Sequence, residues 1–183
     1  MAKTSGSNRG SGGNSSSVNK AIDSIEQKIR YSKIENVAVV NSKGNIIGQG
    51  KGKPNQVKVP VDSLNKLKDA TITHNHPASG TFSREDITLA ISGDVVEIRA
   101  VSKEGTYSLK RPKDGWGVSP SNFNEEYNKI SKRVTTKQDE FIRSYNGDRR
   151  EAIIKSMEMF DVSSIAIKEL SKKHGWKYSH KKV

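Results

Sequence analysis

Apolar side chains recur at two different periods in the N-terminal part of the chain. Ile22, Ile25 and Ile29 follow the three- to four-residue spacing of an amphipathic helix, which we expect to run from residue 18 to about residue 32. Residues 33–40 and 46–50 are strand-like apolar runs on either side of an Asn- and Gly-containing connection. That arrangement predicts a β-hairpin directly after the helix.

A second group of short strands follows. Residues 70–73 are small or β-branched and predict a strand, and residues 95–101 and 106–110 predict a hairpin. Residues 56–60 alternate like an edge strand, and residues 62–68 predict a short helix. A further helix is expected from Ser83 to about residue 91. This mixture of helices and strands predicts an α+β fold.

Beyond residue 120 the apolar spacing becomes helical. Phe123, Tyr127, Ile130 and Val134 share one face of a predicted helix. A second predicted face contains Ile153, Met157 and Phe160, after a break at residues 146–148, and Asp161 can cap a last helix that ends near residue 174. We expect His174 and His180, near the Lys-rich terminus, to be solvated. Whether this segment folds back on the core or binds a partner stays open.

These patterns divide the chain into four parts. Residues 1–17 are rich in Ser, Gly and Asn and predict a flexible tail. Residues 18–112 form the predicted α+β domain, residues 113–120 a linker, and residues 121–183 a helical C-terminal extension.

Composition limits the chemistry. Cysteine is absent from the 183 residues, so a metal site must use His and carboxylate ligands. The net charge of +12 is compatible with an acidic partner and supports contact with nucleic acid weakly. No apolar run approaches a membrane span and no signal peptide is evident, so we expect a cytoplasmic protein, which could also be packaged into a virion.

The most informative segment lies after the strand at residues 70–73. His74 and His76 are two residues apart, so on a strand both imidazoles project from one face. A short loop then leads to Ser83 and Asp86. Two imidazoles and one carboxylate are a ligand set of catalytic zinc. The alternative is that Ser83 and Asp86 form the capping box of a helix and bind no metal.

This segment resembles the JAB/MPN (JAMM) metalloprotease superfamily, especially its RadC-like, phage-type bacterial branch. The resemblance rests on His74-x-His76-Pro followed by Ser83-x-x-Asp86 and covers roughly residues 18–112. The interval from the second His to the Asp is one residue shorter than is usual in the family. The resemblance implies a cytidine-deaminase-like mixed sheet flanked by helices, with zinc bound by His74, His76 and Asp86.

The resemblance also implies roles for two further residues. Ser83 helps to hold the oxyanion, and a glutamate on an earlier segment activates the water. Glu35 is the candidate because it precedes the first predicted hairpin, whereas Glu26 falls on the opening helix and Glu85 points elsewhere. Alternatively, Glu35 is an ordinary solvated charge at the start of a strand.

The function that follows is a zinc-dependent peptidase or isopeptidase, which acts on a protein or peptide substrate and is associated with a phage or mobile element. Two alternatives belong to other classes. One is a non-catalytic structural or assembly protein with the same fold, although such proteins usually lose the histidines. The other is a RadC-like protein associated with nucleic acid.

Overall fold

One mixed sheet organises the molecule. The computed structural model describes residues 12–52 and 64–183. Its elements, in chain order, are α1 (Gly12–Ile29), β1 (Asn36–Val40), β2 (Ile46–Lys51), the short 3-10 helix η1 (Leu64–Leu67), β3 (Thr71–Asn75), α2 (Arg84–Ser92), β4 (Glu97–Ser102), β5 (Gly105–Lys110), α3 (Pro120–Ser144), α4 (Arg149–Met159), α5 (Val162–His174) and β6 (Lys177–Lys182).

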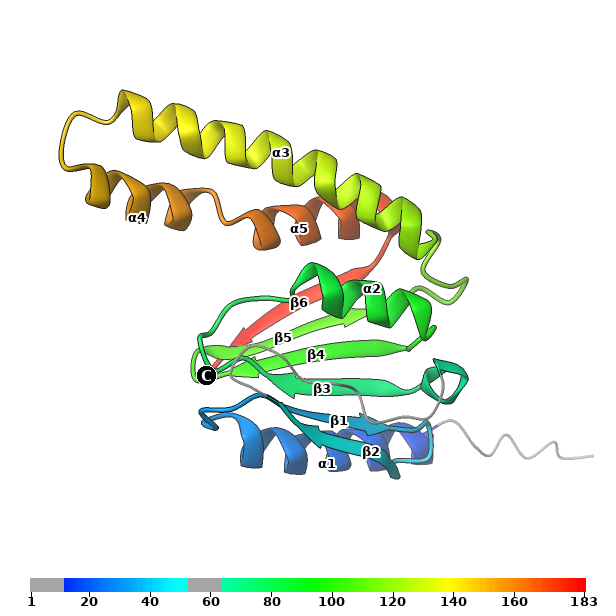
Figure 1. The fold of residues 1–183 in the computed structure, drawn as a ribbon. Helices are drawn as coiled ribbons and strands as arrows, with labels where there is room; N and C mark the ends of the chain where they lie inside the picture. Colours follow the sequence, from blue (N-terminus) through cyan, green and yellow to red (C-terminus); the bar gives the residue numbers. More distant parts are fainter. Residues whose placement is uncertain (1–11, 53–63) are drawn as a thin grey trace, which may run out of the picture.

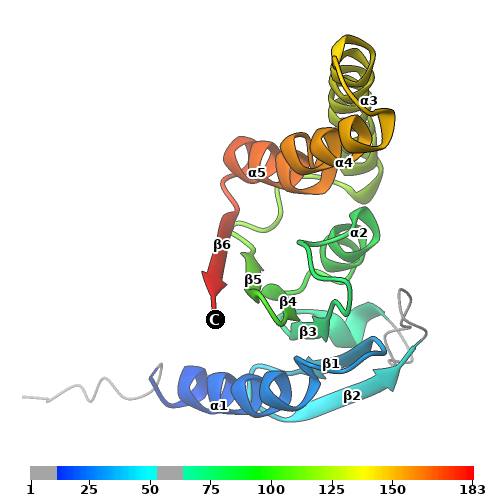
Figure 2. The ribbon, with the colours of Figure 1, turned by 90° about the vertical axis from the view of Figure 1, so that its left-hand side faces the viewer.

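The six strands lie in the order β2-β1-β3-β4-β5-β6. Among these strands of the described residues, β3 and β4 alone pair in parallel, and α2 connects them; the other neighbouring strands are antiparallel. Helix α1 lies on one face of the sheet, while α2 covers the other face, with α3, α4 and α5 above it (Figures 1 and 2). The predicted α+β class is therefore confirmed, with a mixed sheet flanked by helices.

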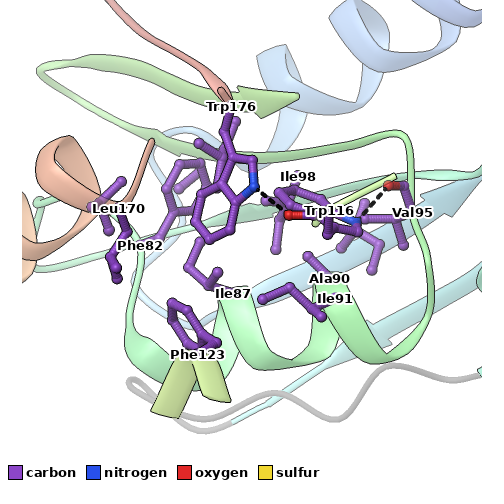
Figure 3. Packing of buried hydrophobic residues seen from close by; sticks show 14 of the residues in the cluster. Phe82, Ile87, Ala90, Ile91, Val95, Ile98, Trp116, Phe123, Leu170 and Trp176 are labelled. Carbon is purple, nitrogen blue, oxygen red and sulfur yellow. Dashed lines mark hydrogen bonds between the residues drawn. The ribbon is translucent and has the colours of Figure 1, made fainter. Parts of the chain in front are cut away.

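Each face of the sheet has its own apolar cluster. On the α1 side, Ile22 and Ile25 pack against Ala38 and Val40 of β1. On the α2 side, a larger cluster joins the sheet to three helices through residues such as Ile98, Ile87, Phe123 and Leu170 (Figure 3). The α2-side cluster fixes β3 and α2, the elements that contain the predicted ligands His74 and Asp86.

The two ends of the chain differ from the predictions. Helix α1 begins at Gly12, inside the segment expected to be a flexible tail. The Ser17 hydroxyl donates to the Lys43 carbonyl oxygen at 3.2 Å, which ties this early part of the helix to the β1–β2 turn. At the other end the extension is not wholly helical, because β6 adds an edge strand to the sheet. The predicted edge strand at residues 56–60 lies outside the described residues.

The C-terminal segment folds back on the core. Trp176 is 5% exposed, and its Nε1–H donates to the Trp116 carbonyl oxygen at 2.8 Å. Trp116, from the predicted linker, donates in turn to the Val95 carbonyl oxygen at 3.2 Å (Figure 3). The two indoles pack edge to face with centroids 5.2 Å apart. The predicted linker is therefore part of the core, and residues 121–183 share the core of the sheet.

Of two further predictions about this segment, the solvation of His174 was wrong and the solvation of His180 was confirmed. His174 is not simply solvated: its Nε2 lies 2.7 Å from Glu126 Oε2, and its ring stacks on Trp176. His180 is exposed, but its ring stacks on Tyr107 with centroids 3.9 Å apart. His174 stacks on a ring of the C-terminal segment itself and His180 on a ring of β5, contacts that the linear sequence did not indicate.

The predicted apolar face of α4 was also wrong. Ile153 is 39% exposed and Met157 is 62% exposed, whereas the small side chains of Ala152 and Ser156 are buried. Helix α4 packs on α3, and small side chains allow a close approach of the two helices.

In the described part of the chain, no helix is long and apolar enough to cross a bilayer.

Replacing Trp176 with alanine should destabilise the whole molecule. A buried Trp→Ala change typically costs about 3–5 kcal/mol, and this one also removes a hydrogen bond to the core. Urea unfolding should show that loss in one cooperative transition, while Ile154→Ala, at a position 51% exposed, should stay within about 0.5 kcal/mol. A loss below about 1 kcal/mol for Trp176→Ala would show that the C-terminal segment is dispensable for the core.

Candidate metal centre

Strand β3 places the two histidines. The Thr73 hydroxyl donates to Glu26 Oε1 on α1 at 3.1 Å, so Thr73 faces α1. Successive side chains alternate across a strand, and His74 therefore faces the α2 side. The backbone N–H of His76 donates to the Val101 carbonyl oxygen at 2.8 Å, which keeps the chain beside β4 just past the end of β3. The two imidazoles stay on the same side, as predicted.

The loop after His76 returns the carboxylate. Phe82 is fully buried and anchors the end of this loop in the α2-side core. Ser83 is the N-cap of α2, and its hydroxyl accepts from the Asp86 N–H at 3.1 Å. The Ser83 N–H donates to Asp86 Oδ2 at 2.7 Å. The predicted capping box is therefore present, and it fixes the same carboxylate that the metal prediction requires.

The three predicted ligand atoms converge. His74 Nε2 lies 2.8 Å from His76 Nε2, and Asp86 Oδ2 lies 3.4 Å from the first and 3.6 Å from the second. Tetrahedral zinc with bonds of about 2.0–2.1 Å would place its ligand atoms about 3.3 Å apart. The three separations bracket that value, so the donor set fits zinc. The capping box and the metal prediction are compatible, because one Asp86 oxygen serves both.

Glu35 also lies beside the two histidines. Its Oε1 is 3.8 Å from His76 Nε2, and one ligand atom from each of Glu35, His74 and His76 lies within 4.8 Å of the others. This group could hold a metal ion. Glu35 is 8% exposed, so it is not the ordinary solvated charge of the alternative interpretation. Glu85 is paired with Arg84 at the surface and lies apart from the group.

Asn75 holds the segment that contains Glu35, a contribution that sequence reasoning missed. Its Oδ1 accepts from the Asn36 N–H at 2.8 Å, and its Nδ2 donates to the carbonyl oxygens of Ser32 and Ile34 at 3.2 and 3.1 Å. These bonds tie the residues before and after Glu35 to Asn75 of β3. The one available signal was an amide side chain between the two histidines, which points away from them.

The electrostatics distinguish the two carboxylates. Burial raises the pKa of Glu35 above its ordinary value, and the charges of His74 and His76 offset only part of this. Burial also acts on Asp86, but the charges and hydrogen bonds of His74 and His76 hold the pKa of that carboxyl well below its ordinary value. Asp86 is therefore the ionised partner of the imidazoles. Glu35 is the carboxylate with the greater proton affinity.

His74 gives the metal-free protein a characteristic pH dependence. Burial opposes the imidazolium, but the charge of Asp86 and its hydrogen bond outweigh burial and raise the pKa of His74 above 6.5. Its stabilising effect should be complete below pH 6.5 and lost as the pH rises through the raised pKa. Asp86 contributes in the opposite sense, with stability lost as the pH falls below 3.8 toward its lowered pKa.

Thermal unfolding of chelated protein across pH tests this assignment. The melting temperature should decline above pH 6.5, and His74→Asn should remove the decline while His180→Asn leaves it. Zinc should reverse the trend, because metal binding requires neutral imidazoles and strengthens as they lose protons. A decline that His74→Asn does not alter would assign the titration to another group.

The structure thus brings Glu35, His74, His76 and Asp86 together at the end of β3, and Ser83 adjoins them through its bonds to Asp86. Among these, the side chain of His74 is 3% exposed, and those of His76 and Asp86 are 15% and 21% exposed. His74 is therefore the most deeply buried of the three, and His76 and Asp86 leave one side of the cluster partly exposed to solvent. Comparison with protein-family models, curated proteins and solved structures finds no match for this chain.

Proposed function

We propose that this protein is a zinc-dependent metallopeptidase or isopeptidase with a JAB/MPN-like fold. The observation that carries the proposal is the convergence of His74, His76 and Asp86 beside a buried glutamate of raised pKa. The order of the elements supports the fold assignment. Glu35 precedes the β1–β2 hairpin, the histidines follow on β3, and Ser83-x-x-Asp86 begins α2.

Zinc held by these three side chains would supply a Lewis acid and would lower the pKa of water toward neutrality. His74 Nε2, His76 Nε2 and Asp86 Oδ2 are the atoms that would hold it. The backbone bonds of the capping box fix Asp86, and the pairing of β3 with its neighbours fixes His74. Such supporting contacts preserve ligand geometry in metal sites.

Glu35 is assigned as the general base. The pKa of Glu35 is raised toward neutral pH. A group whose pKa lies near the working pH can both accept and donate a proton efficiently. Glu35 would take a proton from the attacking water and deliver it to the leaving amine. That the bond cleaved is an amide, in a peptide or an isopeptide linkage, rests on the sequence resemblance.

Ser83 is assigned to the oxyanion. Its hydroxyl oxygen accepts from the Asp86 N–H and still has its own proton to donate. Such a donor stabilises charge that develops on the carbonyl oxygen of the substrate. Association with a phage or mobile element rests on the sequence resemblance alone.

The test is hydrolysis of a casein substrate and of a lysine-linked isopeptide, scored by new amino groups. Chelated protein should be inactive, and zinc should restore activity in the wild type but not in Asp86→Asn. Glu85→Gln, which removes the adjacent exposed carboxylate, should behave as the wild type. Activity that survives chelation, or the absence of activity on both substrates after zinc loading, would contradict the proposal.

A further inference from the structure

Among the residues that the structure describes, helices cover only half of the sheet face opposite the metal centre. Helix α1 packs over β1 and β3, whereas β4, β5 and β6 extend beyond it (Figure 2). Between α1 and these strands lies a groove of about 640 Å³. Thr73 and Arg99, which face α1, pair in register across β3 and β4, while His74 faces the other way. The groove and the metal centre therefore lie on opposite faces.

Polar side chains form a regular array on the floor of the groove. On β5 it consists of Thr106, Ser108 and Lys110, and on β6 of Lys177, Ser179 and Lys181. The antiparallel register sets these residues directly opposite one another as Thr106–Lys181, Ser108–Ser179 and Lys110–Lys177. Alternate residues of a strand are about 6.7 Å apart, so amines and hydroxyls repeat at that interval along β6.

The groove has an excess of positive charge. Six of its lining side chains are Lys or Arg, and two, Asp23 and Glu26, are acidic. Glu26 is already engaged by Arg99, with its Oε1 2.6 Å from Nε. Within the described parts of the chain, no carboxylate lies within ion-pair distance of Lys177 or Lys181. Both amines therefore remain available to an anion.

Two further cations support this interpretation. Arg30 donates to the carbonyl oxygens of Ser102 and Gly105 at 2.7 and 2.9 Å, so neutral partners fix its guanidinium and leave its charge uncompensated. Lys110 lies opposite Lys177, and like charges directly across a strand pair destabilise a sheet. Lys110 has a partner in Glu97 at 3.4 Å, but Lys177 has none there. A bound anion would relieve the repulsion.

An aromatic side chain stands at the rim. Tyr31, just past the end of α1, lines the groove and is 71% exposed. A large ring left in water beside a basic floor has an open face for stacking. Basic grooves with exposed aromatic rings are the combination that binds single-stranded nucleic acid, because phosphates meet the cations and bases stack on the rings.

We propose that this groove binds a single strand of nucleic acid. The phosphates would lie along β5 and β6, where Lys177, Ser179 and Lys181 offer charged and neutral donors, and one base would stack on Tyr31. An acidic peptide would meet the same charges, but it would make no use of the exposed ring as a stacking platform. This function is independent of the metal centre.

Fluorescence anisotropy with a labelled oligothymidylate about 16 nucleotides long tests the proposal. Lys177→Ala/Lys181→Ala should weaken binding and reduce the magnitude of the slope of log affinity against log salt by about 1.4, since each neutralised phosphate on a single strand contributes about 0.7. Tyr31→Ala should weaken binding about tenfold and leave the salt slope unchanged, because stacking carries no charge. Both variants should retain wild-type zinc content.

The matched control is Lys132→Ala/Lys137→Ala, which removes two exposed lysines from α3 and gives the same net charge. It should bind as the wild type. Equal losses in the two double variants would overturn the proposal and assign the affinity to overall charge. The proposal would also be overturned if Tyr31→Ala had no effect, or if polyglutamate bound in the groove more tightly than the oligonucleotide at equal salt.

Discussion

His76→Ala is expected to abolish stoichiometric zinc binding while the protein remains folded. The change removes one of three converging ligand atoms. The His76 side chain is 15% exposed and lies at the accessible side of the cluster, so its loss should leave the core intact. Loss of an outer contact to a metal site already costs about 10–100-fold in affinity, so loss of a ligand should exceed 100-fold. Competition against a chromophoric chelator measures the affinity.

The matched control is His180→Ala, which removes an exposed imidazole stacked on Tyr107, far along the chain from the cluster. It should retain wild-type affinity. If His76→Ala bound zinc as tightly as His180→Ala, the proposed ligand set would be wrong. Circular dichroism of both variants separates lost binding from lost structure.

Glu35→Gln is expected to lower the rate of amide hydrolysis by about 10²–10⁴-fold, the range typical for loss of a general base. Glutamine keeps the size of the side chain but cannot accept the proton. Zinc content should stay at the wild-type level, because Asp86 and not Glu35 is the assigned carboxylate ligand. Rate and metal content are measured on the same preparation.

This variant also distinguishes the two carboxylates. Asp86 Oδ2 lies 3.4 and 3.6 Å from the imidazole nitrogens, whereas Glu35 Oε1 lies 3.8 Å from His76 Nε2. The lowered pKa of Asp86 and the raised pKa of Glu35 point to the same division of roles. Loss of zinc in Glu35→Gln, with retention in Asp86→Asn, would exchange the two assignments.

The features that local sequence could predict are those that local chemistry determines. Alternation along a strand put His74 and His76 on one face, and the spacing of Ser83 and Asp86 predicted the capping box that the structure contains. The same holds for both hairpins and for α2. Even the proximity of Asp86 to the histidines follows from a short loop, since few residues separate them.

Contacts between distant segments were not predictable in this way. Strand β6 has a Lys-rich pattern that resembles a solvated tail, and it becomes a strand because β5 offers a free edge and Trp176 anchors its start. The burial of Ala152 instead of Ile153 depends on how closely α4 approaches α3. The bonds of Asn75 to the segment around Glu35 likewise join residues far apart in sequence.

The most direct test of the proposed metal site is the zinc content of the protein purified without chelator, measured by mass spectrometry for the wild type, Asp86→Asn and Glu85→Gln. About one zinc per chain is expected in the wild type and in Glu85→Gln, and a large loss in Asp86→Asn. Absence of zinc from the wild type, even after incubation with the metal, would contradict the proposed site, and so would equal zinc in all three proteins.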